Sequence, residues 1–330
     1  MSAGSPDRRL GADARPEVVV FDPMPCSDLV VPLAAWPERG DKVLAVDVTE
    51  MDGGVSANFA VAAARLGATV HVFGWAGSDR ESRTMLTAFQ AEGIDTAAIR
   101  RRRGAAVFRT IVLVGPDGER SVVLVPPARL PAALDPAWAS TLEDMHPALT
   151  YVGPWDGAAA LFAGAADRAG GVLAATLESG TAVRDLRELA RVSILFLSRE
   201  AAASVGWDPR RPDHMPEGWR HGPAVVVVTL GVSGSRYWRT AIGRGWSAPA
   251  PETRALDATG AGDAYAAAFC LLWLQGVRGE ALLAGANAAG AVAVTGRGPR
   301  GALASPGTVA AAVAEWRHRA RAMRGTATTP

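Results

Sequence analysis

Short apolar runs alternate with helix-like stretches along most of the chain. The runs are rich in β-branched residues and do not alternate with polar ones, and they lie at 17–21, 69–73, 149–152, 172–175, 194–197 and 224–230. The stretches between them have the composition and spacing of helices, at 56–66, 83–92, 158–169 and 185–191. Continuous apolar strands are typical of strands buried on both faces. The pattern therefore predicts an α/β fold with a mostly parallel sheet.

One region departs from this rhythm. The runs 107–114 and 121–125 flank the sequence GPDG at 115–118, which is a hairpin signal. Together with 42–48, they predict a small antiparallel sheet that stands off the main body as a lid. We expect one domain at 16–322, with a lid formed by about 24–50 and 104–127, a disordered arm at 1–15 and a flexible tail at 323–330.

Composition and charge exclude several classes of protein. The formal net charge of +1 creates no field that would recruit nucleic acid or a membrane surface. The two cysteines, Cys26 and Cys270, provide neither a disulfide framework nor a paired metal motif. Residues 1–15 lack the apolar region of a signal peptide, and no apolar run reaches the roughly 18 residues of a membrane helix. We expect a soluble, cytoplasmic protein.

Three common enzyme motifs are missing. The first strand is not followed by GxGxxG, which argues against a dehydrogenase. The chain has one lysine, Lys42, and it lies outside any GxxxxGK[ST] sequence, so a P-loop is excluded. The histidines show no HExxH spacing, so a zinc hydrolase is not supported.

The sequence DATGAGD at 257–263 has the strongest chemical signal. It precedes an apolar helix predicted at 261–275, and Gly260 and Gly262 allow the backbone to turn tightly beside a ligand. The amides of Ala261, Gly262 and Asp263 would lie unpaired at the helix N-terminus, which favours bound anions. The Asp263 carboxylate beside that site could accept a proton from an attacking hydroxyl. The alternative is a glycine-entered helix in which Asp263 only complements the helix dipole.

This segment, extended to Tyr265, resembles the C-terminal signature DTxGAGD of the ribokinase-like (PfkB) carbohydrate kinase family. Other motifs of the family follow in order: GGVSAN at 53–58 resembles GGxxxN, GWAGSD at 74–79 resembles GxxGxD, EGID at 92–95 resembles EGVD, and TLGVSG at 229–234 resembles TxGxxG. Segments 286–289 and 294–298 resemble those that close over adenine and a monovalent cation. The resemblance covers about residues 17 to 310. It implies a ribokinase-like three-layer α/β/α sandwich with a mostly parallel central sheet and a small antiparallel β lid.

The resemblance also implies roles for single residues. Substrate hydroxyls would be held by Asp28, Gly54, Asn58 and Asp263, although Asp28 could be a solvated turn residue and Asn58 a helix cap. ATP would contact Thr229, Gly231, Gly234, Asn287 and, through Mg²⁺, Glu200. Thr229 could instead simply end a strand, and Asn287 could be a structural amide. A K⁺ site would involve Asp257, Thr259 and backbone carbonyls near Ala293 and Gly298, whereas Asp257 could equally form a turn.

The chain departs from the family pattern at several positions. Leu197 replaces the Asn of the NxxE motif, a pattern related to that of ketohexokinase-like members. Val55 replaces the Lys of the ribokinase GGKGAN motif, and the strand at 149–153 continues as Pro154-Trp155-Asp156 where the family often has Glu or Gln. Trp155 and Asp156 could line the substrate pocket or belong to the core and a turn. Because of these departures, the substrate cannot be inferred from that of ribokinase.

The resemblance implies an ATP-dependent kinase for a primary hydroxyl of a sugar or sugar derivative. Asp263 would be the general base, the Gly260, Ala261, Gly262 and Asp263 amides an anion hole, and Mg²⁺ would bridge the phosphates. The alternative is a nucleoside kinase of the same fold, with Trp36, Phe108 and Trp155 as walls for the base. A non-catalytic sugar- or nucleotide-binding protein is a third reading, since the NxxE Asn is lost. We also expect a homodimer formed through the lid.

Overall fold

The structure is a computed structural model that describes residues 15–23, 26–102, 106–116, 120–125, 134–180, 189–208, 219 and 221–326. Nearly all of the predicted arm at 1–15, most of the predicted helix at 185–191 and the last residues of the predicted tail, 327–330, lie outside the described residues. The final helix, α8 (Pro306–Thr326), continues into the segment predicted as a tail.

A nine-stranded sheet forms the centre of the molecule. Its order is β13 (Arg244–Ala248), β12 (Ser235–Arg239), β11 (Val225–Thr229), β10 (Ile194–Ser198), β9 (Val172–Leu177), β8 (Leu149–Val152), β1 (Glu17–Asp22), β4 (Thr69–Ala76) and β5 (Ile99–Arg101). The strands from β11 to β5 are parallel, and β12 and β13 add an antiparallel hairpin at one edge. All six predicted strands are present.

Helices cover both faces of this sheet. Successive side chains of a strand point to opposite faces, and in β1 Val18 and Val20 pack into one core while Val19 and Phe21 pack into the other. The first core is closed by α1 (Val55–Arg65), α2 (Arg80–Ala91), α6 (Ala261–Leu274), α7 (Glu280–Ala293) and α8. The second is closed by α3 (Ala137–Met145), α4 (Gly157–Ala169) and α5 (Arg199–Ser204). The predicted three-layer α/β/α sandwich is confirmed.

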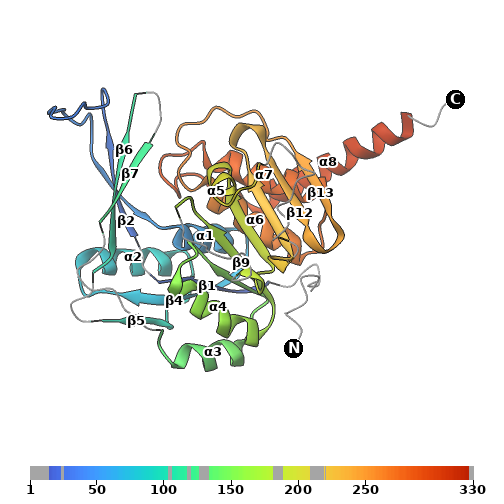
Figure 1. Cartoon of the computed structure of the whole chain (residues 1–330), viewed down its shortest axis with the longest axis horizontal. Coiled ribbons are helices and arrows are strands. Elements are labelled where there is room, and N and C mark those ends of the chain that lie inside the picture. The colour runs from blue at the N-terminus through green and yellow to red at the C-terminus, as the bar shows by residue number, and fades with distance from the viewer. Residues whose placement is uncertain are drawn as a thin grey trace.

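A second, four-stranded sheet projects from the main body, as the blue and green strands of Figure 1 show. Its order is β3 (Thr49–Gly53), β2 (Cys26–Pro32), β6 (Phe108–Val114) and β7 (Arg120–Val125). The predicted hairpin is therefore β6–β7. Two of the three pairings are antiparallel, and β2 runs parallel to β6. We call this sheet the lid.

The strand predicted at 42–48 is wrong. Only Ala45 makes a bridge there, to Leu33, and the third lid strand is the following segment, β3. The apolar side chains that suggested a strand are largely exposed, Leu44 to 89% and Val46 to 69%. They therefore have no core to pack against, whereas β3 gains the free edge of β2.

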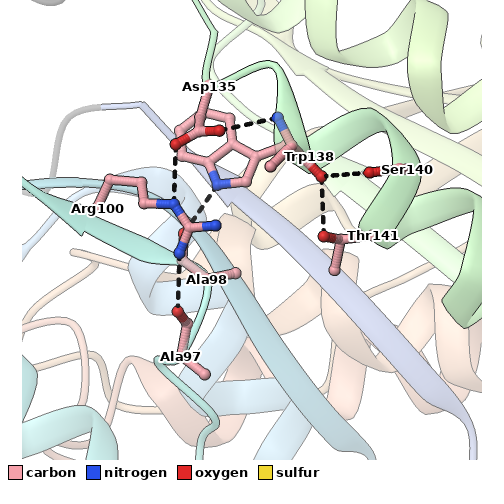
Figure 2. Close-up of polar contacts among 8 residues, drawn as sticks. Ala97, Ala98, Arg100, Asp135, Trp138, Ser140 and Thr141 are labelled. Carbon is pink, nitrogen blue, oxygen red and sulfur yellow. Dashed lines mark hydrogen bonds and ion pairs between the residues drawn. The ribbon is translucent and has the colours of Figure 1, made fainter.

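A cluster of polar contacts joins the edge strand β5 of the main sheet to α3, as Figure 2 shows. Asp135 accepts hydrogen bonds from Nε of Arg100 and from the amide of Ala137, each 2.8 Å long. The buried indole of Trp138 donates to the carbonyl oxygen of Ala98 over 2.9 Å. These contacts fix the start of α3 beside β5, on the opposite side of the sheet from α6.

The strand order marks the carboxyl end of β1 as a place where a ligand can bind. Strand β1 lies between β4, the next strand of this sheet along the chain, and β8, which comes after all four lid strands. In open parallel sheets, ligands bind outside the carboxyl ends of the strands where the connections diverge. The lid strand β2, the start of α1 and the start of α6 all belong to this region.

None of the helices within the described residues has the length and apolar character needed to cross a bilayer.

Candidate active site

The start of α6 keeps two of the three unpaired amides that the sequence predicts. Gly260 caps the helix in the left-handed conformation, with φ of 75°. The amide of Ala261 donates to the carbonyl oxygen of Ala258 over 3.3 Å, so it is already engaged. Among the described residues, the amides of Gly262 and Asp263 have no acceptor, and a Cβ built on Gly262 would meet nothing within 4 Å. Of the three amides predicted to be unpaired, those of Gly262 and Asp263 are therefore open to an anion and that of Ala261 is not.

Asn58 of α1 reaches the first turn of α6. Its Nδ2 donates to Oδ2 of Asp263 over 2.9 Å, which joins the GGxxxN and DATGAGD motifs directly. Burial raises the pKa of Asp263 to about 8, although the bond from Asn58 and the charge of Arg300 act in the opposite direction. A carboxyl with such a pKa is matched to proton transfer near neutral pH. The helix-cap alternative for Asn58 is not what the geometry shows, since its side chain is directed at another helix.

Asp28 lies in the lid strand β2, where it is 8% exposed. Its Oδ1 accepts a hydrogen bond from Sγ of Cys26 over 3.0 Å, and the same sulfur lies 2.6 Å from Oγ1 of Thr110. Burial and the nearby carboxylate of Asp28 raise the pKa of the Cys26 thiol, so the thiol remains a donor. Asp28 is therefore held in place by the lid and is not a solvated turn residue.

The glycine pair Gly53-Gly54 lets Asp28 approach α1. A Cβ built on Gly53 would lie 2.0 Å from Oδ2 of Asp28, so any side chain there would displace the carboxylate. Gly54, at φ of 97°, precedes the first residue of α1 in a conformation that favours glycine. The structure thus brings Asp28, Gly54, Asn58 and Asp263 together, and their role in binding a substrate stays a prediction.

The TLGVSG segment lies at the carboxyl end of β11. Thr229 ends the strand, and Gly231 and Gly234 have positive φ on either side of a tight turn. A Cβ on Gly234 would lie 2.1 Å from the carbonyl oxygen of Ala248, whereas one on Gly231 would be in open space. Gly234 is therefore required by packing against the end of β13. Gly231 is the glycine at which a ligand can approach the backbone.

Glu200 and Asn287 have different surroundings. Glu200 is exposed in the first turn of α5. This helix directly follows β10, the neighbour of β11 in the sheet, so Glu200 can face a ligand there. The buried amide of Asn287 accepts from Oγ of Ser235 over 2.8 Å and donates to the carbonyl oxygens of Ala248 and Pro249, over 3.1 Å each. Both of its N–H groups are used, so its side chain braces β12 and β13. The geometry favours the structural alternative for Asn287.

Asp257 ties the anion-hole segment to the loop after α7. Its Oδ1 accepts from the amide and the hydroxyl of Thr259, over 2.8 and 2.6 Å, and its Oδ2 accepts from the amide of Gly298 over 2.8 Å. Ala293, the last residue of α7, has its carbonyl oxygen 3.3 Å from the amide of Gly296. The four residues predicted for K⁺ therefore include a carboxylate that forms the turn at Thr259 and holds the loop at Gly298.

Arg300 is the main site residue that the sequence did not predict. Its Nε donates to Oδ1 of Asn58 over 3.1 Å, and its Nη1 lies 3.9 Å from Oδ2 of Asp52. The side chain is 14% exposed. No motif or periodicity marks this position, because the contact joins residues 242 apart in the chain.

Other predicted pocket residues lie elsewhere. Trp155 is 4% exposed and packs in the second core, and Asp156 caps α4 by accepting from the amide of Ala159 over 2.7 Å. Trp36 is exposed to 37%, whereas Phe108 is half-buried at the start of β6. Trp155 is thus not available as a wall for a nucleoside base.

Comparison with known proteins identifies a family and similar folds. The family model for the pfkB family carbohydrate kinase matches residues 17–305. The ribokinase of Bacillus subtilis is 28% identical over 285 residues, which are 84% of this chain and 93% of that protein.

Two solved structures share the fold. The structure of Arabidopsis thaliana ribokinase complexed with ribose and ATP has a TM-score of 0.75 at 21% identity, covering 91% of this chain and 99% of that one. The Burkholderia thailandensis nucleoside kinase in complex with inosine has a TM-score of 0.72 at 16% identity, covering 90% of this chain and 96% of that one. With its family motifs, its three layers and its match over 17–305, this chain belongs to the pfkB family of carbohydrate kinases.

Proposed function

We propose that this protein is an ATP-dependent kinase that transfers the γ-phosphoryl group to a primary hydroxyl of a sugar or sugar derivative, with Asp263 as general base. The observation that carries the proposal is the pairing of Asn58 with Asp263, 2.9 Å apart, beside the open amides of Gly262 and Asp263. A carboxylate next to open amides supports the assignment of Asp263 as proton acceptor and of the amides as an anion hole.

The substrate would bind between the lid and α1. Asp28 offers Oδ2 to a hydroxyl while Cys26 holds its Oδ1. Gly54 and Asn58 border the same space at the start of α1. A polar substrate with several hydroxyls matches a carboxylate and an amide that together supply acceptors and donors. The lid would exclude water during transfer and so limit hydrolysis of ATP.

ATP would bind over the carboxyl ends of β10 and β11, near Thr229, Gly231 and Glu200. The exposed carboxylate of Glu200 suits a water-bridged Mg²⁺ ion, which supplies charge neutralisation to the phosphates when bound. K⁺ would bind beside Asp257 and Thr259, where it would brace the segment that carries the anion hole. Location in the cytoplasm and a dimer formed through the lid stay predictions.

The function is tested by release of ADP over a panel of pentoses, hexoses, sugar acids and nucleosides, with and without K⁺. We expect turnover of at least one sugar, and a fall of about 10² to 10⁴ in kcat for Asp263→Asn with substrate binding retained. A panel without any turnover would support the non-catalytic reading. Turnover of nucleosides alone would support a nucleoside kinase, and an equally active Asp263→Asn variant would exclude the mechanism.

A further inference from the structure

We propose that Arg300 is a positioning residue that fixes the side-chain amide of Asn58 in the orientation that serves Asp263. The inference rests on the proposed function, because it concerns the same general base. It starts from a chain of two hydrogen bonds: Arg300 Nε to Asn58 Oδ1, 3.1 Å, and Asn58 Nδ2 to Asp263 Oδ2, 2.9 Å.

The guanidinium group of Arg300 determines which way the Asn58 amide is turned in these two hydrogen bonds. A guanidinium group has five donors and no acceptor, so it can contact only the oxygen of an amide. With Oδ1 held by Arg300, the Asn58 amide must present its N–H₂ group to Asp263. A flipped amide would place N–H₂ against the guanidinium and its oxygen against the carboxylate, which is unfavourable at both ends. Arg300 thereby selects one of two otherwise similar orientations.

The selected orientation favours the ionised form of Asp263. An ionised carboxylate only accepts hydrogen bonds, whereas a protonated one can also donate to an amide oxygen. With Arg300 in place, Asn58 offers only a donor, so the O–H of the protonated acid finds no acceptor on Asn58. The charged groups that act on Asp263 also include Glu178 after β9 and Asp28 in β2, which disfavour ionisation, while Arg300 favours it.

The backbone of Arg300 is held independently of its side chain. The amide of Gly298 donates to Asp257 over 2.8 Å, and the carbonyl oxygen of Arg300 accepts from Nη1 of Arg65 over 3.3 Å. Arg65 is itself paired with Glu92 over 2.6 Å. Replacing the Arg300 side chain should therefore leave the loop in place, so that a variant reports on the side chain alone.

The experiment compares Arg300→Met, Arg300→Lys and the control Arg297→Met, an exposed residue of the same loop, in kcat/KM for the sugar as a function of pH. For Arg300→Met we expect the acidic limb of the profile to move up by about one pH unit, a loss of about tenfold at neutral pH that is recovered at high pH. Arg300→Lys should recover part of the shift, and Arg297→Met should match wild type.

A double-mutant cycle with Asn58→Ala separates positioning from a general effect on the fold. If Arg300 acts through Asn58, Arg300→Met should have a clearly smaller effect in the Asn58→Ala background than in wild type, and the remainder is the direct effect of the Arg300 charge on Asp263. Independent, multiplying losses, or an Arg300→Met variant that loses activity equally at every pH, would overturn the inference. If Arg300→Met does not fold, as judged by thermal melting, the same comparison with Arg300→Lys decides. A wild-type protein without kinase activity would instead count against the proposed function.

Discussion

Asp263 is subject to two opposing influences whose balance sets its protonation. Its position at the N-terminus of α6 and its bond from Asn58 favour the carboxylate. Loss of hydration on burial favours the acid and is the larger effect, which is why its pKa lies near 8 and not near the ordinary value of 3.8. At neutral pH the proposed base would therefore be mostly protonated until substrate binding or a rise in pH changes the balance.

The first prediction concerns the rate as a function of pH. Because only the ionised form of Asp263 can accept a proton, kcat/KM for the sugar should rise about tenfold per pH unit below pH 8 and level off above it. The residual activity of Asp263→Asn should lack this limb. Initial rates from pH 5.5 to 9.5 provide the measurement, and a wild-type profile that is flat between pH 6 and 9 would contradict the assignment.

The same pKa predicts a change in stability. Between about pH 4 and pH 8 the folded protein holds a proton on Asp263 that the unfolded chain has released, so the free energy of unfolding falls as the pH rises through this window. Asp263→Asn removes this cost. The free energy of unfolding of the variant, minus that of wild type, should be larger at pH 9 than at pH 5. Urea denaturation at the two pH values provides the measurement. If the difference in free energy of unfolding between the two proteins is the same at both pH values, the pKa of Asp263 is not raised in the folded protein.

At the scale of the element, the two glycines that begin α6 should behave differently. Gly260 has φ of 75°, and a Cβ there would lie 2.7 Å from Cα of Pro299, whereas Gly262 is in the first helical turn with open space beside it. Gly260→Ala should destabilise the fold, by on the order of 1–3 kcal/mol. Gly262→Ala should fold as wild type but lose about 10² in kcat, because its Cβ would occupy the anion hole.

Thermal melting and ADP release, measured on both variants, test this pair. Each glycine serves as the control for the other, since the substitutions are chemically identical and two residues apart. A Gly262→Ala variant with wild-type kcat would mean that no phosphoryl group approaches these amides.

The same elements show what the sequence can and cannot predict. Buried strands such as β1 and β11 are continuous apolar runs, so they were found with nearly correct limits. β3 was missed because its sequence, TEMDG, is largely polar and forms a strand only because β2 offers an edge. The motifs located Asn58 and Asp263, but no local pattern could predict Arg300, whose role depends on where the fold places a loop far away in the chain.

At the scale of the whole molecule, the lid leaves apolar surface uncovered. Strand β7 is at the edge of the lid sheet, and its residues Val122 and Leu124 are exposed to 54% and 63%. An edge strand with exposed apolar side chains tends to pair with another copy of itself unless it is protected. The predicted homodimer would cover this edge.

Leu124→Glu tests the dimer by placing a charge at that edge. Sedimentation velocity should show a dimer for wild type and a monomer for Leu124→Glu, while the control Leu161→Glu, which changes a leucine exposed to 61% on α4, should remain a dimer. Because the lid also positions Asp28, the monomer should bind the sugar more weakly, with a higher KM and little change in the KM for ATP. A wild-type monomer at micromolar concentration, or a Leu124→Glu dimer, would contradict the prediction. A monomer with unchanged KM would show that each lid closes its own site without help from a second copy.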